Sequence, residues 1–282
     1  MNLHILPTSY PINSRAAAYG DGCFTTMLLE NGSIQHQKQH FERLRYSCQR
    51  LDFPEFNIGQ FATATTKFLA EHHARIANKA VLKALVTVSG GGRGYSRSDD
   101  AELDIYMSVH DYPQHYPQWQ QNGISLGVAS LTLGKQPLLS GLKHLNRLEQ
   151  VLIKQEKESF IHTHNSQRIG IDDVIVCDAE GMMVETSTAN LFWRKHKHWY
   201  TPCLDDAGVA GVIRGVIANY FNEQGVLLNH VREPVLSLLD ADEVIICNSI
   251  LGIAPVKNLI YDKLQTGYDI SQATIQYSDL NS

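Results

Sequence analysis

The pair Asn31-Gly32 lies between two runs of strand-forming residues, and it is the feature that most restricts how this chain can fold. Asparagine followed by glycine suits the positive φ angles of a tight turn, so residues 24–30 and 33–35 are predicted to pair as a β-hairpin. Apolar residues then recur at helical spacing from Phe41 to Leu51, which predicts a helix that ends before Pro54. A hairpin followed by an amphipathic helix favours a mixed α/β fold.

The rest of the chain continues this alternation of strand and helix. Asn57 is suited to cap a second helix because its side chain can accept a hydrogen bond from the first turn. Helices are also predicted from Asn146 to about Phe160 and after Gly211. Apolar runs predict strands at 80–88, 103–109, 124–133, 174–177, 182–185, 190–193 and 243–247.

Residues 112–122 separate the two halves and contain two prolines but no apolar period, which is typical of a linker. A chain of 282 residues with 43% hydrophobic residues can fill one large core or two modest ones. We therefore predict a small N-terminal α/β domain over residues 1–112, a linker over 113–122, and a larger domain over 123–282.

Composition and charge argue against several classes of protein. The 24 basic and 29 acidic side chains form no long run of one sign, so nucleic-acid binding is not expected. No apolar run approaches the length of a membrane span, and the N-terminus lacks a secretion signal, so we expect a cytoplasmic protein without a membrane partner. The five scattered cysteines favour free thiols in a reducing compartment, and the 13 histidines lack the spacing of a metal site.

Two segments carry candidate chemistry. Lys143 is near Leu142 and Leu145, in a turn predicted to open the helix from Asn146. A lysine held among apolar residues can lose its proton and attack a carbonyl group, although a lysine near a helix start is far more often solvated. About forty residues later, Glu185 ends an apolar strand and faces a hydroxyl-rich turn. A pyridoxal phosphate enzyme needs such a pair, a lysine for the aldehyde and an acid for the ring nitrogen.

Four blocks spread between about residue 17 and residue 256 then carry a resemblance to a known family. They are Tyr19-Gly-Asp-Gly-Cys-Phe-Thr-Thr26, Arg93-Gly-Tyr-Ser96, Lys143-His-Leu-Asn-Arg-Leu-Glu-Gln-Val-Leu152 and Asn190-Leu-Phe-Trp-Arg194. With them the chain resembles the fold type IV pyridoxal phosphate enzymes, the branched-chain and D-amino-acid aminotransferase-like family. The blocks at Lys143 and Arg93 are similar to those of its aminodeoxychorismate lyase branch. The resemblance implies a two-domain α/β (α+β) fold with a larger, mixed-sheet, barrel-like C-terminal domain.

The resemblance also implies a set of cofactor-binding residues for pyridoxal 5'-phosphate. Lys143 would form the covalent bond, and Glu185 would pair with the pyridine nitrogen. Arg43, in His40-Phe-Glu-Arg-Leu44, resembles the arginine that binds the cofactor phosphate, with Arg45 as a weaker alternative. On spacing alone, Arg43 is more often a solvated helix residue, whereas Gly208–Gly211 is as often an ordinary turn as a phosphate-binding one. The backbone amides implied to meet the phosphate are those of Val212, Ile213, Ser249 and Ile250, with the Ser249 hydroxyl as a further donor.

The activity implied by the resemblance is a lyase reaction, in which 4-amino-4-deoxychorismate gives 4-aminobenzoate and pyruvate for folate biosynthesis. Its substrate is a dianion, so a cation is expected at the pocket mouth. Arg93, on a glycine-flanked loop, is the main candidate, and its alternative interpretation is a solvated loop arginine. Arg97 and Arg147 are weaker candidates, and Thr25 or Thr26 is expected to line the substrate side.

Two other functions stay open. The region after the lysine reads His144-Leu-Asn-Arg-Leu148, without the tyrosine of branched-chain aminotransferases, but the D-amino-acid branch shares this departure. An aminotransferase of the D-amino-acid or branched-chain type is therefore the first alternative, and a non-catalytic relative that binds a phosphate ligand is the second. A homodimer is implied by the resemblance alone.

Overall fold

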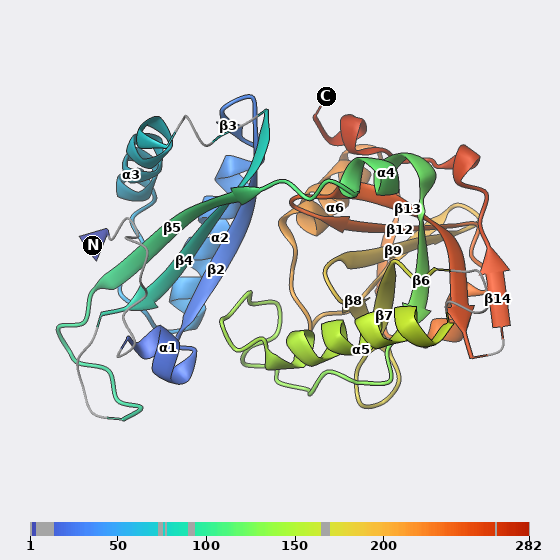
Figure 1. Cartoon of the computed structure of the whole chain (residues 1–282), viewed down its shortest axis with the longest axis horizontal. Helices are drawn as coiled ribbons and strands as arrows, with labels where there is room; N and C mark the ends of the chain where they lie inside the picture. The colour runs from blue at the N-terminus through green and yellow to red at the C-terminus, as the bar shows by residue number, and fades with distance from the viewer. Residues whose placement is uncertain are drawn as a thin grey trace. The chain divides into compact units, whose positions relative to one another are not determined.

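The computed structural model describes residues 2–3, 14–72, 76, 78–89, 94–164, 170–262 and 264–281. The chain divides into two compact units, which Figure 1 colours by residue number. The first unit is Met1–Pro113 with Leu142–Asn146, and the second is Gln114–Gly141 with Arg147–Ser282. The predicted α/β fold with a smaller and a larger part is confirmed. The predicted domain limits, as segments that fold alone, remain a prediction.

The described part of the first unit contains a five-stranded sheet in the order β1-β5-β4-β2-β3. The predicted hairpin is confirmed, because β2 and β3 pair antiparallel around Asn31 and Gly32, whose φ angles are 51° and 78°. The predicted cap is also present, since Asn57 Oδ1 accepts a 2.9 Å hydrogen bond from the Gln60 amide. The elements are β1 (Asn2–Leu3), α1 (Arg15–Tyr19), β2 (Gly22–Glu30), β3 (Ser33–Ile34), α2 (Gln37–Arg50), α3 (Ile58–Glu71), β4 (Lys79–Val88) and β5 (Leu103–Asp111).

One face of this sheet builds the first core. Successive strand residues point to opposite faces, so alternate residues of β2 and β4 pack against α2 and α3. The core-facing side chains include Cys23, Met27, Leu82, Ala84 and Val86, packed with Phe41, Leu44 and Phe61. The half-buried Phe24 and Thr26 alternate with these residues and therefore lie on the opposite face.

The described part of the second unit contains a mixed nine-stranded sheet, ordered β11-β10-β9-β12-β13-β6-β7-β8 with β14 beside β13. Strand β8, at one end of this order, also contacts β9 and β10, so the sheet curls on itself and the predicted barrel-like form is confirmed. The strands are β6 (Ile124–Val128), β7 (Asp173–Cys177), β8 (Met183–Thr186), β9 (Asn190–Lys195), β10 (His198–Pro202), β11 (Leu228–Val231), β12 (Glu243–Asn248), β13 (Gly252–Tyr261) and β14 (Leu264–Gly267). The helices are α4 (Tyr116–Asn122), α5 (Leu148–His164) and α6 (Val212–Glu223), with 3-10 turns at Val235–Leu238, Ile270–Gln272 and Tyr277–Asn281.

The structure differs from the sequence interpretation at several elements, and the short elements β1, α1, β10, β11 and β14 were not predicted. The stretch interpreted as a linker contains α4, because Pro117 is tolerated in a first helical turn and Trp119 packs against the second core. Strand β13 was not predicted, since Pro255 interrupts its apolar run. Strand β6 ends at Val128, earlier than predicted, and α5 begins at Leu148, later than predicted.

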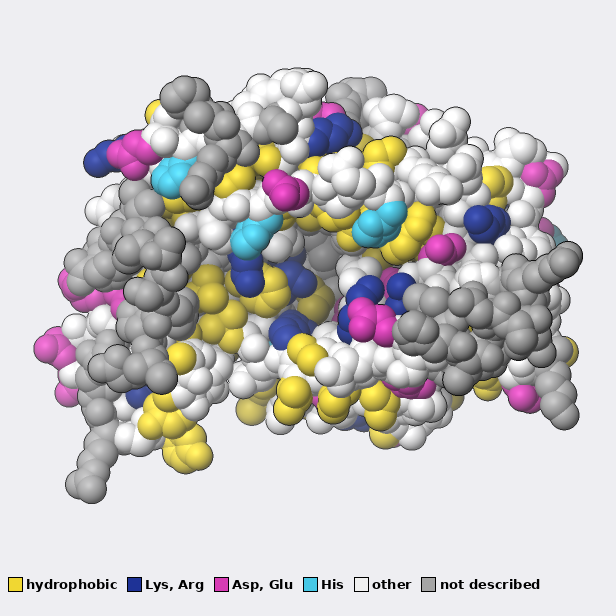
Figure 2. Space-filling view, viewed as in Figure 1, with side chains coloured by type: hydrophobic (Ala, Val, Ile, Leu, Met, Phe, Trp, Pro, Cys, Tyr) yellow, Lys and Arg dark blue, Asp and Glu magenta, His cyan; other side chains and the backbone are white. Residues whose placement is uncertain are grey.

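The described surface is chemically mixed. Acidic and basic side chains are both distributed over the face shown in Figure 2. Of the helices in the described ranges, none combines the length and the apolar character needed to cross a lipid bilayer.

Candidate active site

The segment that carries Lys143 is extended and pairs with β2. The Phe24 amide donates to the Lys143 carbonyl at 2.9 Å, and the Leu145 amide donates to the Gly22 carbonyl at 3.0 Å. The prediction that Lys143 lies in the turn opening a helix is therefore wrong. The physical reason is that β3 pairs only with Leu29 and Glu30, so this edge of β2 has room for another strand near Phe24.

Two lysines contact one aromatic ring in the first unit. Lys143 Nζ lies 4.7 Å from the Phe24 ring centroid, and Lys83 Nζ lies 5.1 Å from the same centroid, both within cation–π range. Lys83 is opposite Thr26 in the β2–β4 register, so it shares the face of Phe24 and Thr26. Sequence reasoning did not single out Lys83, although a lysine inside an apolar strand was a usable signal.

Arg43 lies on α2 in a polar cluster with Thr25 and His40. An Arg43 Nη2 group donates to Thr25 Oγ1, and Thr25 Oγ1 is 2.7 Å from His40 Nδ1. Burial, with the positive charges of Arg43 and His36, holds the pKa of His40 well below 6.5, so the ring stays neutral at physiological pH. Thr25 is fully buried in this cluster, which separates it from Thr26 on the other face of β2.

The residues predicted to bind substrate carboxylates have different outcomes. Arg93 lies outside the described residues. Arg97 forms two hydrogen bonds to the Asp21 carboxylate, at 3.1 and 2.7 Å, and is therefore engaged in an internal ion pair. Arg147 belongs to the second unit, where burial lowers its pKa while the charges of Glu185 and Glu149 act to raise it.

Glu185 lies near the end of β8 with its side chain buried. Its Oε2 atom accepts a 2.9 Å hydrogen bond from the Val209 amide, which fixes the carboxylate against the turn that precedes α6. The hydroxyl groups after Glu185 do not turn toward it. Ser187 and Thr188 instead donate to the buried Asp173 carboxylate, and Thr186 Oγ1 closes a local turn with Ala189.

The turn Gly208–Gly211 is held by a residue that sequence reasoning missed. Asn190 Nδ2 donates to the Val209 carbonyl at 2.8 Å, and Asn190 Oδ1 accepts from the Gly211 amide at 3.1 Å. Gly208 has a φ of +86°, and a Cβ added there would lie 2.6 Å from Val184 Cγ1. Glycine is therefore needed at this position, both for its conformation and for its size.

The predicted phosphate donors lie in the second unit. Val212 and Ile213 are the first residues of α6, whose N-cap is Gly211 without a capping side chain. Amides at a helix start favour an anion, so this end of α6 suits a phosphate group. Ser249 and Ile250 lie in the turn between β12 and β13, where the Ile250 amide donates to Asn248 Oδ1 at 2.9 Å. Asn248 thus already fixes that turn.

The candidate residues therefore form one set in each unit. Lys143, Arg43 and Thr26 belong to the first unit, whereas Glu185 and the four candidate phosphate-binding residues belong to the second. The chemistry of the sets is an amine beside an aromatic ring, a half-buried arginine bonded to a buried threonine, a buried carboxylate, and uncapped helix amides.

Comparisons with known proteins are consistent over nearly the whole chain. Residues 22–259 match the family described as amino-transferase class IV. The chain is 34% identical to an aminodeoxychorismate lyase from Vibrio harveyi over 95% of its own length and 93% of that protein. It is also 34% identical to an aminodeoxychorismate lyase from Bacillus subtilis, over 91% of this chain and 83% of that one.

A solved structure shares the fold. The crystal structure of 4-amino-4-deoxychorismate lyase from Pseudomonas aeruginosa matches with a TM-score of 0.81 and 30% identity, over 98% of this chain and 94% of that chain. The predicted family and the fold type IV class are thus confirmed. On the family match and these similarities, the chain belongs to the amino-transferase class IV family.

Proposed function

We propose that this protein is a lyase that converts 4-amino-4-deoxychorismate into 4-aminobenzoate and pyruvate, a step of folate biosynthesis. The observation that carries this proposal is the 34% identity with the Vibrio harveyi aminodeoxychorismate lyase over 95% of the chain. The chain keeps the lysine, the strand-end glutamate and the helix arginine on which the resemblance depends. The protein is accordingly an enzyme.

The cofactor is pyridoxal 5'-phosphate, which when bound withdraws electrons from the substrate carbon that carries the amino group. The residues of the chain fit this group. Lys143 is assigned to its aldehyde carbon and Glu185 to its ring nitrogen. The phosphate is assigned to the Val212 and Ile213 amides, where α6 begins without a capping side chain, and to Arg43 and Ser249. Ile250 is assigned to it as well, and its amide would then exchange the hydrogen bond to Asn248 Oδ1 for one to the phosphate.

Glu185 is assigned to stabilise the charge on the ring nitrogen, and Lys143 is assigned to transfer the proton. The hydrogen bond from the Val209 amide orients the Glu185 carboxylate, which is assigned to accept a charge-assisted hydrogen bond from the protonated ring nitrogen. Lys143 Nζ is assigned as the general base that takes the proton from the substrate carbon bearing nitrogen. Its contact with the Phe24 ring restricts where the amine can lie.

The substrate supplies much of the driving force. Removal of that proton and loss of the enolpyruvyl side chain as pyruvate leave an aromatic ring, and aromatisation makes the step favourable. The protein therefore has to orient the substrate and position one base. We assign Arg93 to a substrate carboxylate and Thr26 to the substrate side, and the shared face of Thr26 and Phe24 supports the second assignment.

The proposal is tested by incubating the purified protein with 4-amino-4-deoxychorismate and following the fluorescence of 4-aminobenzoate. Lys143→Ala should abolish product formation, whereas the exposed Lys197→Ala should retain it. Borohydride treatment of the protein loaded with cofactor, followed by peptide mapping, should place the adduct on Lys143. An adduct on another lysine would contradict the assignment.

An aminotransferase is the second candidate, because the matching family is described by that activity. The same preparation offered D-alanine and 2-oxoglutarate should then form pyruvate and glutamate at a rate above that of 4-aminobenzoate formation. The lyase proposal expects the reverse order of rates.

We also propose a homodimer. Helix α5 supports it by exposing Leu148, Val151 and Leu152, at 70%, 49% and 46%, on one face with i, i+3 and i+4 spacing. Hydrophobic side chains are visible in Figure 2 along the edge where α5 runs. Light scattering should give a dimer for the wild type and a monomer for Leu152→Glu, with Leu264→Glu on β14 as the matched exposed control.

We propose a cytoplasmic location because of the state of the cysteines. Cys23, Cys48, Cys177 and Cys247 are buried free thiols, and Cys203 is a half-buried free thiol. Free thiols of this kind are typical of proteins in a reducing compartment.

A further inference from the structure

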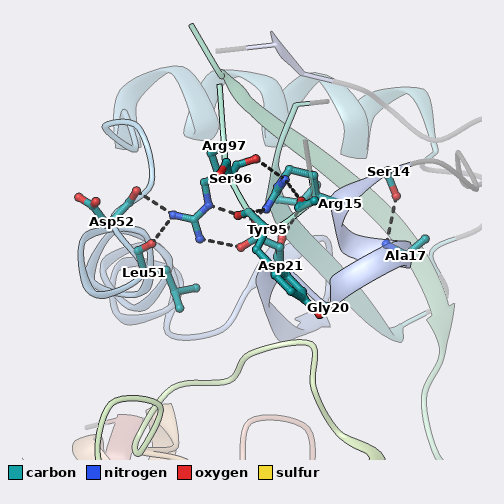
Figure 3. A network of polar contacts seen from close by, with 12 residues as sticks. Ser14, Arg15, Ala17, Gly20, Asp21, Leu51, Asp52, Tyr95, Ser96 and Arg97 are labelled. Atoms are coloured by element: carbon teal, nitrogen blue, oxygen red, sulfur yellow. Dashed lines mark hydrogen bonds and ion pairs between the residues drawn. The ribbon is translucent and has the colours of Figure 1, made fainter. Parts of the chain in front are cut away.

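Arg43 is held by a different kind of partner from two other arginines of the first unit. Arg15 donates to the Asp21 carboxylate at 2.8 Å, and Arg97 donates to both oxygens of the same carboxylate at 3.1 and 2.7 Å (Figure 3). These contacts neutralise charge as well as fixing geometry. The Arg43 Nη2 group donates instead to the hydroxyl of Thr25, which carries no charge. This hydrogen bond therefore orients the Arg43 guanidinium without neutralising it.

The sheet places Thr25 where its hydroxyl group can reach α2. Thr25 shares the core-facing side of β2 with Met27, and it is fully buried. Its neighbour in the β2–β4 register is Ala84, whose short side chain leaves room above the sheet. His40 and Arg43 are three residues apart on α2, so they lie on the same side of the helix. Both side chains bond to Thr25 from that side.

The Thr25 hydroxyl has a single proton, and its two partners fix the direction of that proton. Thr25 Oγ1 accepts a hydrogen bond from Arg43, so its own proton is available to His40 Nδ1 at 2.7 Å. His40 Nδ1 must then be the ring nitrogen that carries no proton. A protonated Nδ1 would donate to the same oxygen, and the hydroxyl proton would have to turn away from both partners. The chain from His40 through Thr25 to Arg43 is therefore ordered only when the ring is neutral.

The surroundings of His40 keep the ring in this state, at a cost to stability. Burial, with the positive charges of Arg43 and His36, holds the pKa of His40 well below 6.5. His40 Nε2 is buried and has no hydrogen-bond partner among the residues that the structure describes. An unpaired buried polar atom is destabilising, so an apolar side chain at this position would serve the core better. The polar cluster is thus better explained by what it does for Arg43 than by packing.

We propose that Thr25, oriented by His40, is a positioning residue that fixes the Arg43 guanidinium for the phosphate of the cofactor. This inference rests on the proposed function, in which Arg43 is assigned to that phosphate. Thr25 and His40 are fully buried, so they act through Arg43 and do not contact a ligand themselves. An arginine that is already held in one conformation loses less side-chain entropy when it binds an anion, and this gain is expected in cofactor affinity.

The experiment compares two ligands that differ only in the phosphate group, pyridoxal 5'-phosphate and pyridoxal. Each is titrated into the full-length protein from which bound cofactor has been removed, and the absorbance of the ligand gives its Kd. Thr25→Val keeps nearly the same shape but loses the hydroxyl. It should raise the Kd of pyridoxal 5'-phosphate about five- to tenfold, the effect of one side chain that is no longer pre-organised. The Kd of pyridoxal should stay unchanged.

Three further variants control for effects on the fold. Thr25→Ser keeps the hydroxyl group and should restore the wild-type Kd of pyridoxal 5'-phosphate. Thr65→Val is the matched control and should leave both Kd values unchanged, because Thr65 is a buried threonine of the same unit whose hydroxyl donates to Met107 Sδ at 3.7 Å. Circular dichroism checks that each variant is folded. Should Thr25→Val not fold, His40→Phe is measured instead, because it removes the acceptor of the hydroxyl proton and should weaken phosphate binding in the same way.

A double variant shows whether Thr25 acts through Arg43. Arg43→Ala should weaken the binding of pyridoxal 5'-phosphate at least as much as Thr25→Val does, and the two changes together should cause no further loss. Additive losses would mean that Thr25 acts independently of Arg43 and would overturn the inference. Equal losses for pyridoxal and pyridoxal 5'-phosphate in Thr25→Val would show a general structural role and would overturn it as well.

Failure of this inference is distinguishable from failure of the proposed function. A wild-type protein that forms no 4-aminobenzoate overturns the proposed reaction, and the Kd values then decide alone whether Thr25 positions Arg43. Normal product formation with an unchanged Kd of pyridoxal 5'-phosphate in Thr25→Val overturns the positioning role only. An Arg43→Ala variant that binds the cofactor as tightly as the wild type overturns the assignment of Arg43 and, with it, this inference.

Discussion

Asn190→Ala tests how much the Gly208–Gly211 turn depends on one side chain. Asn190 is 5% exposed, and its two hydrogen bonds hold the Val209 carbonyl and the Gly211 amide on either side of the turn. A net hydrogen bond contributes about 1 kcal/mol, and leaving a partly buried partner unpaired adds to the loss. Both partners are only half-buried, so water can replace part of the interaction. We expect the unfolding free energy to fall by about 2–3 kcal/mol.

Tryptophan fluorescence reports the unfolding of the structural unit that contains Asn190. The three tryptophans, Trp119, Trp193 and Trp199, all belong to the second unit, which also contains Asn190. With a urea dependence of about 2 kcal/mol per molar, the unfolding midpoint should shift down by roughly 1–1.5 M at an unchanged slope. Cofactor-free protein is used because a bound ligand would add its own stabilisation.

Asn258→Ala is the matched control for this prediction. Asn258 is half-buried in the same unit and makes a 3.0 Å hydrogen bond to Ser125 Oγ, which is a single side-chain contact. Its loss should cost about 1 kcal/mol. If Asn190→Ala shifted the midpoint no further than Asn258→Ala, the idea that Asn190 holds both sides of the turn would be refuted.

Two further predictions concern the first unit. The pKa of His40 in the folded protein lies well below 6.5, so the unfolded chain binds a proton at a higher pH than the folded chain does. Neutral His40 therefore contributes fully to stability above about pH 6.5, and this contribution is lost as the pH falls toward the folded pKa. His40→Gln should therefore reduce the decrease in unfolding free energy between about pH 7 and 5, measured by urea unfolding monitored with circular dichroism. If the unfolding free energy of the variant fell with pH as steeply as that of the wild type, the prediction would be wrong. Gly20→Ala should destabilise the protein more than Gly32→Ala. Both glycines have a positive φ, but a Cβ at Gly20 would lie 2.3 Å from Asn146 Oδ1, whereas a Cβ at Gly32 would meet nothing within 4 Å. Conformational strain alone is about 1–2 kcal/mol, so equal midpoints for the two variants would show that Asn146 moves aside without loss.

Local signals predicted the local structure well. The Asn31-Gly32 turn and the Asn57 cap depend on neighbours two or three residues away, so the sequence contains the information that forms them. Strand β13 was missed because a proline and polar residues mask a run whose burial depends on β12 and β6 beside it. The start of α5 was misplaced because β2 takes up the Lys143 segment as an added strand.

The candidate site shows the same difference between residues that local motifs predict and residues whose partners lie far away in the sequence. Lys143, Glu185 and Arg43 were found from a resemblance of motifs, and the roles given to them remain proposals. Asn190 and Arg15 were not assigned any function, because most of their partners are backbone carbonyls and amides, which leave no signature in side-chain identity. A contact between residues 79 to 81 positions apart, such as Arg15 with Gly94–Ser96, needs the fold before it can be seen.

The assignment of residues 142–146 to the first unit has a consequence for dissecting this protein. The polypeptide passes from one unit to the other at residues 113/114, returns at 141/142, and leaves again at 146/147. A fragment that begins at Gln114 would carry Lys143 but not the strand edge to which its backbone is bonded. Gene fragments cut at the apparent border would therefore separate Lys143 from Gly22 and Phe24, and complementation between co-expressed halves would require this added strand to form between chains.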